Sequence, residues 1–388
     1  MLAAAARLAT SQTNLNQVTD PSIHKPVTVE EMERLSRVIS DETRSSVELI
    51  GEYHTETGDL NNRLDFYRAG ARLNYRWQPG LNFYLSGVRT QYMTLGDVLD
   101  GNGTNVTAGA RIALADGVNG QFEIGATRFN TSTSTINALA SLNFKASDAA
   151  TFYLTGSRSN VEESLLSAIG LRPVNGPFAG RLVGRVMDNR VVGGLQYRLP
   201  LNFDVSAEGG GGVREGLNVD DNFFRLARAG LGYNPVSQPQ DETLSLFRVG
   251  YFFEYLGYDE DRLGFGGASL LTRRGQRILP SQLGIDGISP EPGPGRPGVG
   301  GYFSPQRYTS HAGRAELEGR PLSVLRYRLA GFAGAQSYTG SPTREVYGVS
   351  ATAELVFTDR FSLPVTFARD NYGPFTQQTL WARLVVKL

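Results

Sequence analysis

The chain has 388 residues, and its 38 basic and 38 acidic side chains balance, which excludes a global field that would attract nucleic acid. It contains no cysteine, which excludes disulfides, thiolate metal sites and cysteine nucleophiles. No apolar run reaches about 18 residues, so no transmembrane helix is expected. A chain of 388 residues can form either one large all-β unit or two or three smaller domains.

The N-terminal residues are predicted to be helical in two places. Residues 1–27 resemble the remnant of an Ala-rich helix followed by a polar linker, and Arg7 interrupts the only apolar stretch that could serve in a signal peptide, so an export signal is expected upstream. Residues 28–44 are predicted to form a short periplasmic helix and a linker. Thr28 and Glu31 have the spacing of a capping box, and apolar residues recur at helical spacing up to Ser40.

From Ser45 onward apolar and polar residues alternate. In "RLDFYRAGARLNYRW" (63–77), Tyr67, Leu73 and Tyr75 fall on one face and the arginines on the other, which is typical of a β-strand. The alternation returns at 105–115, 135–144, 246–255 and 345–357. About sixteen such segments of about 10–14 residues suit tilted strands that cross a bilayer. Residues 45–388 are therefore predicted to be all-β, a transmembrane antiparallel β-barrel of about 16 strands.

A soluble β-sandwich is the alternative fold, but three features favour the membrane barrel. The polar faces are rich in Arg and Glu, which a dry core could not hold. The last segment, "LWARLVVKL", alternates to the end of the sequence, as in a closing barrel strand. Aromatic residues near the strand ends fit the interfacial girdles of outer-membrane barrels: Tyr75, Trp77, Tyr84, Phe144, Tyr255, Phe357 and Trp381.

If the apolar faces contact lipid, the polar faces line a lumen. The candidate pore-lining residues are Arg68, Arg72, Asn74, Arg76, Arg111, Glu123, Arg248, Glu254, Arg314, Glu316, Arg328 and Glu354. Both signs of charge are present, so such a lumen would offer hydrogen bonds to a polar, roughly neutral solute. The alternative is that opposite charges pair across strands and stiffen the wall.

Catalysis has little support in the sequence. Ser310 and His311 are strand neighbours and face opposite sides, so they cannot form a nucleophile–base pair. Glu316 and Glu318 share a face about 7 Å apart, within the glycosidase range, but a solvated lumen wall explains them better. The glycines of "EGGGGVREG" (208–216) lie in a strand pattern and form no phosphate loop. No catalytic, metal or cofactor-binding residue is predicted.

One motif at the end of the long Pro- and Gly-rich loop (272–304) is more specific. The stretch "GGYFSPQRY" (300–308) contains Tyr302, Phe303, Gln306, Arg307 and Tyr308, and it resembles a signature of the C-terminal outer-membrane barrel domain of the bacterial cellulose synthase protein C family. The entry to the barrel at 34–75 is similar to that family, and "LAAAARLATSQ" (2–12) resembles its last tetratricopeptide helix. The resemblance extends from about residue 28 to residue 388.

The resemblance implies a sixteen-stranded pore in the outer membrane of a Gram-negative bacterium, surrounded by lipid, that exports an exopolysaccharide, most simply the glucan cellulose. It also implies helical repeats upstream that contact periplasmic synthase or scaffold components. Tyr302, Phe303 and Tyr308 would then lie at the pore mouth or the membrane girdle, with Gln306 and Arg307 anchoring the loop. A general diffusion porin for small solutes and a structural or adhesive envelope barrel are the alternatives.

Overall fold

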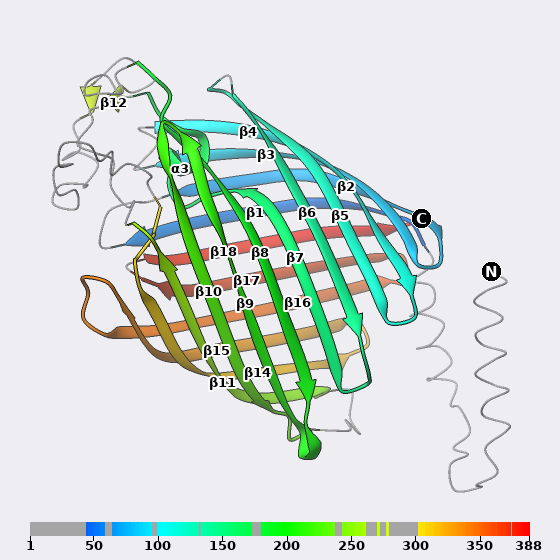
Figure 1. The fold of residues 1–388 in the computed structure, drawn as a ribbon. Helices are drawn as coiled ribbons and strands as arrows, with labels where there is room; N and C mark the ends of the chain where they lie inside the picture. The colour runs from blue at the N-terminus through cyan, green and yellow to red at the C-terminus, as the bar shows by residue number, and fades with distance from the viewer. Residues whose placement is uncertain are drawn as a thin grey trace, which may run out of the picture.

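A computed structural model describes residues 44–58, 64–94, 99–131, 133–172, 180–236, 243–260, 270–271, 277–278, 302–373 and 375–388. Within them, sixteen strands form a closed barrel in which every neighbouring pair is antiparallel (Figure 1). The predicted all-β barrel and its strand number are confirmed. The predicted remnant at 1–27, the predicted helix from Thr28 to Ser40 and nearly all of the loop at 272–304 lie outside the described residues.

Each barrel strand pairs with the next barrel strand along the chain, and the first pairs with the last. The barrel strands are β1 (Ser46–Gly58), β2 (Asp65–Gln78), β3 (Leu81–Thr94), β4 (Leu99–Ala115), β5 (Val118–Phe129), β6 (Ser134–Lys145), β7 (Ala150–Asn160), β8 (Gly184–Arg198), β9 (Phe203–Leu217), β10 (Val219–Tyr233), β11 (Leu246–Tyr258), β14 (Tyr308–Leu322), β15 (Leu325–Tyr338), β16 (Arg344–Thr358), β17 (Phe361–Tyr372) and β18 (Phe375–Lys387). Closure between β1 and β18 leaves no unpaired strand edge, which a bilayer could not satisfy.

Three short elements lie outside the barrel wall. They are the helix α3 (Leu165–Ile169), the 3-10 turn η1 (Pro200–Asn202), and a two-stranded sheet of β12 (Leu270–Leu271) and β13 (Arg277–Ile278). None of the helices in the described part of the chain is long and apolar enough to cross a bilayer.

The barrel wall has an apolar outer face and a polar inner face. On β2 the side chains of Tyr67 and Leu73 are about half exposed on the outside, whereas Asn74 is buried on the inside. On β5 Ile124 points outward and is 64% exposed, while its neighbour Glu123 points inward. Alternation along each strand therefore separates the two faces, because successive side chains point to opposite sides of a sheet.

The structure corrects the prediction for two of the girdle aromatics. Tyr84 is buried on the inner face, under the guanidinium of Arg72 at 3.9 Å from the ring centre, because its neighbours Phe83 and Leu85 occupy the outer face. Trp381 also lies on the inner face, where the guanidinium of Arg383 is 4.8 Å from its ring. Trp381 lies in the middle of β18, and for both residues the alternation along the strand decides the face.

The glycine-rich stretch is part of β9, as the sequence predicts. A side chain at Gly210 would place its Cβ 2.2 Å from the carbonyl oxygen of Val191 on β8, so this position requires glycine. The inner face of β9 can therefore lie close to its neighbours.

The two ends of the barrel differ. Short turns such as 79–80, 116–117, 323–324 and 359–360 lie at the end where β1 begins and β18 ends. The two longest connections, from β7 to β8 with α3 and from β11 to β14, start and finish at the opposite end (Figure 1). Barrels of this kind have their short turns in the periplasm, so α3 is at the extracellular end, which we call the outer mouth.

Candidate functional site: the lumen and its outer mouth

The structure places all twelve candidate pore-lining residues on the inner face of the wall. Most of them contact an oppositely charged or polar side chain on an adjacent strand. On β10, Arg228 lies between Glu208 of β9 at 2.9 Å and Glu254 of β11 at 2.7 Å. Charge pairing across strands, the alternative raised by the sequence, therefore describes much of this wall.

A second group of charges surrounds Glu316, whose side chain is only 3% exposed. Arg314 donates to it at 3.3 Å, and Arg328 on β15 forms an ion pair with the same carboxylate. Arg328 also meets Glu318 at 3.1 Å. Glu316 and Glu318 are thus both ion-paired with arginines, an arrangement that suits a rigid wall.

The remaining candidates are distributed around the lumen. The inner-face contacts include Arg68 with Glu52, Asn74 with Glu48, Arg111 with Gln121, Gln121 with Glu123, Arg248 with Asp204, and Arg326 with Glu354. Arg72 lies on Tyr84. Sequence reasoning missed the acidic partners Glu48, Glu52, Asp204 and Glu208, although each alternates in the same way as the arginines.

An aromatic pocket opens on the inner wall between β11, β14, β15, β16 and β17. Its volume is about 410 Å³, and Phe252 and Phe332 form an edge-to-face pair in it with ring centres 5.5 Å apart. Arg314, Ser350 and Asp370 add polar groups. Gly348 makes room for this arrangement, because a Cβ there would lie 2.3 Å from the Phe332 ring. The sequence did not indicate this pocket, because its lining comes from five strands that are distant in the chain.

The connection between β7 and β8 folds into the outer mouth. We call its residues 161–172 and 180–183 the plug. Ser164 caps α3 by accepting a hydrogen bond from the Ser167 main-chain N–H at 3.1 Å, and the Ser167 hydroxyl accepts one from the Ser164 N–H at 3.0 Å. Every residue of α3 is buried.

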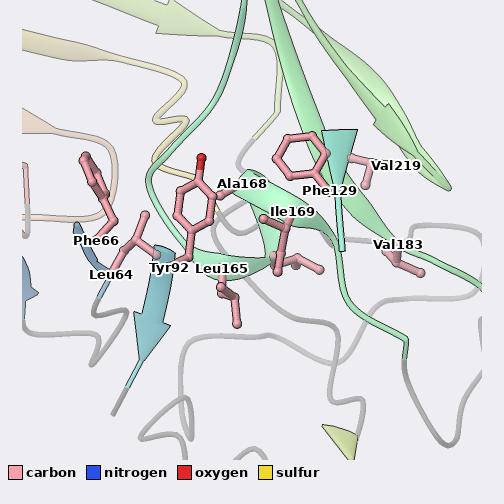
Figure 2. Packing of buried hydrophobic residues seen from close by; sticks show 10 residues of the cluster. Leu64, Phe66, Tyr92, Phe129, Leu165, Ala168, Ile169, Val183 and Val219 are labelled. Carbon is pink, nitrogen blue, oxygen red and sulfur yellow. The ribbon is translucent and has the colours of Figure 1, made fainter. Parts of the chain in front are cut away.

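The helix contributes to a hydrophobic cluster that joins distant strands (Figure 2). Leu165 and Ile169 pack with Phe66 of β2, Tyr92 of β3 and Phe129 of β5. The sequence did not indicate that the connection between β7 and β8 would fold against the inside of the wall.

Two adjacent acidic residues hold the plug to opposite parts of the wall. Glu162 accepts hydrogen bonds from Arg68 at 2.7 Å and from the Tyr92 hydroxyl at 2.5 Å. Glu163 pairs with Arg214 of β9 at 2.9 Å and accepts the main-chain N–H of Phe303 at 2.6 Å. The plug is thereby tied both to β2–β3 and to β9.

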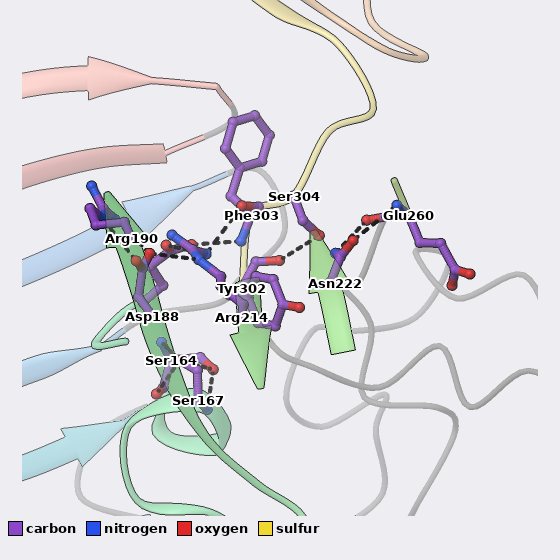
Figure 3. A network of polar contacts seen from close by, with 11 residues as sticks. Ser164, Ser167, Asp188, Arg190, Arg214, Asn222, Glu260, Tyr302, Phe303 and Ser304 are labelled. Atoms are coloured by element: carbon purple, nitrogen blue, oxygen red, sulfur yellow. Dashed lines mark hydrogen bonds and ion pairs between the residues drawn. The ribbon is translucent and has the colours of Figure 1, made fainter. Parts of the chain in front are cut away.

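Arg214 is the centre of the polar network at the outer mouth (Figure 3). Besides Glu163, it contacts Asp188 of β8 at 3.2 Å, and its guanidinium lies over the rings of Tyr258 and Tyr302 at 5.1 and 4.8 Å. The side chains of Arg214 and Asp188 are only 9% and 3% exposed. A buried arginine with two carboxylates and two aromatic faces is a strong structural anchor.

The sequence motif meets the plug at this network. Tyr302 is fully buried beside Arg214, and Phe303 is surrounded by Tyr308, Tyr338, Tyr372 and Phe375, with ring centres 5.4 to 6.1 Å away. The aromatic side chains thus lie within the mouth. Gln306 donates to the carbonyl of Asp259 at 3.4 Å, whereas Arg307 is anchored through its main chain, which exchanges hydrogen bonds with Thr339.

We expect Phe303→Ala to destabilise the barrel by about 3–5 kcal/mol, because it removes the central ring of a buried aromatic cluster. Denaturant unfolding in lipid vesicles measures this free energy. The matched control is Phe357→Ala, since Phe357 is 54% exposed on the outer wall and its truncation leaves no cavity. Equal unfolding midpoints for the two variants would contradict the central role of Phe303.

A metal site is not formed by the residues that the structure describes, since no group of three or more His, Cys, Asp or Glu side chains converges among them. His54 bonds to Thr379 at 3.0 Å on the inner face, and His311 contacts Tyr251 on the outer face. His311 and Ser310 face opposite sides, as strand geometry predicts.

The closed sixteen-stranded wall, apolar outside and polar inside, defines an outer-membrane β-barrel. Residues 85–267 match the model of the family described as "Cellulose synthase operon protein C C-terminus". The predicted resemblance to this family is thereby confirmed over that range, and so is the predicted location in the outer membrane.

Comparison with solved structures finds one match above a TM-score of 0.5 among those described here, and two weaker ones. The "Bacterial polysaccharide outer membrane secretin" superposes with a TM-score of 0.60 at 9% identity over 89% of this chain and 99% of its own. CdiB from Acinetobacter baumannii has a TM-score of 0.41 at 9% identity over 87% of this chain and 60% of its own. OccK5 from Pseudomonas aeruginosa has a TM-score of 0.39 at 10% identity, over 90% of this chain and 99% of its own. Curated proteins gave no match.

Proposed function

We propose that the chain is an outer-membrane channel that exports an exopolysaccharide, and that this polymer is cellulose. The observation that carries the proposal is the match of residues 85–267 to a family named for the cellulose synthase operon. The barrel provides a passive path, and the chemical work of polymer synthesis is assigned to other proteins. The predicted contacts with periplasmic synthase or scaffold components remain a prediction.

The chemistry of the inner wall supports a neutral, hydroxyl-rich solute. Arginines and carboxylates occur in pairs, so the wall offers many hydrogen-bonding groups with little net attraction for ions of either sign. The Phe252–Phe332 pocket presents aromatic faces beside Arg314, Ser350 and Asp370. Aromatic faces stack on the C–H surfaces of sugar rings, and the polar neighbours can bond to their hydroxyls.

The plug gives the channel a closed state. It occupies the outer mouth, and Glu162 and Glu163 hold it to the wall. A polymer would therefore have to displace the plug before leaving the barrel, which keeps the membrane sealed when no chain is being exported.

Deletion of the gene tests the proposed function. We expect a strain without this chain to continue polymer synthesis and to stop secretion, so that glucan accumulates inside the outer membrane. The measurement is the glucan content of the medium and of the cell fraction. Normal secretion together with slower uptake of small sugars would overturn the proposal in favour of a general diffusion porin.

A pair of double variants tests the role of the inner aromatics. Phe252→Ala/Phe332→Ala is expected to reduce secretion several-fold at unchanged barrel content in the membrane. The control, Phe83→Ala/Phe122→Ala, removes two outward rings that are each 43% exposed and is expected to secrete normally. Equal secretion by both variants would show that the pocket does not contact the polymer.

A further inference from the structure

Four arginines on the outer face of the barrel differ from those inside. Most inner-facing arginines meet a carboxylate: Arg68, Arg190, Arg214, Arg228, Arg248, Arg314, Arg326, Arg328 and Arg383. Arg89, Arg128, Arg225 and Arg369 are exposed, and within the described residues their side chains form no ion pair or hydrogen bond. An unpaired arginine on a lipid-facing wall needs an anionic partner from outside the chain.

Their outward direction follows from their neighbours. Thr90, next to Arg89, is buried and accepts a hydrogen bond from Arg68 on the inner face. Phe224 and Leu226, on either side of Arg225, are also buried inside. Since successive side chains of a strand alternate, the arginines point to the outside.

These arginines share a height on the wall. Starting from the turn end, the outward residues of β3 are Leu81, Phe83, Leu85 and Gly87, followed by Arg89. On β10 four apolar outward residues likewise precede Arg225, and on β17 four precede Arg369. Eight residues span about 26 Å along a strand, which at the usual tilt of about 35–45° is about 20 Å across the membrane. The apolar band of such barrels is about 25 Å tall, so the arginines lie near its extracellular edge. That edge is where the headgroups of the outer leaflet lie.

The positive charge is densest between β3 and β8. Arg89, Thr104 and Arg128 are register partners on β3, β4 and β5, which places the two arginines two strands apart, about 10 Å. Arg185 donates to the carbonyl of Ser134, the register partner of Arg128, at 3.1 Å. We call Arg89, Thr104 and Arg128 the arginine row.

We propose that the arginine row is a binding site for the phosphorylated glycolipid of the outer leaflet, with its phosphates on Arg89 and Arg128 and its acyl chains along the apolar wall below. Guanidinium groups bind phosphate oxygens through paired hydrogen bonds, and these are strong next to a low-dielectric medium. Two arginines about 10 Å apart can hold two phosphates of one headgroup. Thr104 lies between them and offers a hydroxyl to the sugar.

The test uses the folded barrel in neutral detergent with three probes: diphosphorylated lipid A, dephosphorylated lipid A and phosphatidylglycerol. We expect diphosphorylated lipid A to bind and to raise the unfolding temperature, and Arg89→Gln/Arg128→Gln to weaken its binding at least about tenfold. Arg198→Gln/Arg360→Gln removes two charges at the turn end instead and is expected to bind like the unchanged barrel. Higher salt should weaken binding to the unchanged barrel.

Two results would overturn the proposal. One is unchanged lipid A affinity in Arg89→Gln/Arg128→Gln, and the other is equal affinity for phosphatidylglycerol with the same dependence on the two arginines. The shift in gel mobility on heating shows whether each variant is folded before lipid is added. If the double variant does not fold, the two single variants are measured, and unchanged affinity in both would equally overturn the proposal.

Discussion

Removing the charges of Glu162 and Glu163 is expected to open the outer mouth. In planar bilayers, Glu162→Gln/Glu163→Gln should show an open probability at least about tenfold higher than the unchanged barrel, since about 1.4 kcal/mol of lost anchoring is a tenfold shift. The reason is that these carboxylates pair with Arg68 and Arg214, and an amide cannot replace an ion pair with a largely buried guanidinium. Single-channel current is the measurement.

The matched control removes two carboxylates from the same lumen without touching the plug. Glu208→Gln/Glu254→Gln takes away both partners of Arg228, so it should alter ion selectivity and leave the closed state unchanged. If both double variants open equally, the effect belongs to lumen charge and the plug is not a gate. If neither opens, the aromatic and hydrophobic contacts of α3 are sufficient for closure.

The second large effect is expected at Arg214. Arg214→Ala should cost about 3–5 kcal/mol of stability, because it leaves Asp188 and Glu163 near one another without their shared cation. Denaturant unfolding measures the loss. Limited proteolysis should also show earlier cleavage within the plug, since the plug loses its tie to β9.

Arg190→Ala is the control for Arg214→Ala. Arg190 also pairs with Asp188, but it is 36% exposed and forms no hydrogen bond or ion pair with the described residues of the plug. We therefore expect a loss below about 1 kcal/mol and unchanged cleavage of the plug. A loss as large as that of Arg214→Ala would mean that Asp188 alone holds the outer mouth together.

The fold could be predicted from the sequence because the relevant pattern is local. Alternation with a period of two is visible within a single strand, so Tyr67 and Leu73 outside, and Arg68 and Arg72 inside, could be assigned before any partner strand was known. The motif at 300–308 was also readable in one stretch. It predicted a resemblance to the family whose model matches residues 85–267, a range that does not include the motif itself.

The site could be predicted only in part, since its contacts join strands that are distant in sequence. Arg383 and Glu48 are 335 residues apart, and their pairing depends on the register between β18 and β1. Sequence also contains no sign that Glu162 would reach Arg68.

The amino-acid pattern alone specifies a barrel of about sixteen strands with one apolar and one charged face. Only the tertiary structure shows which charges meet, that the plug lies in the outer mouth, and that Arg89 and Arg128 share one register row without a carboxylate partner among the described residues. The physical reason is that alternation assigns a side chain to a face, whereas barrel closure, register and loop packing decide which groups share that face at the same height.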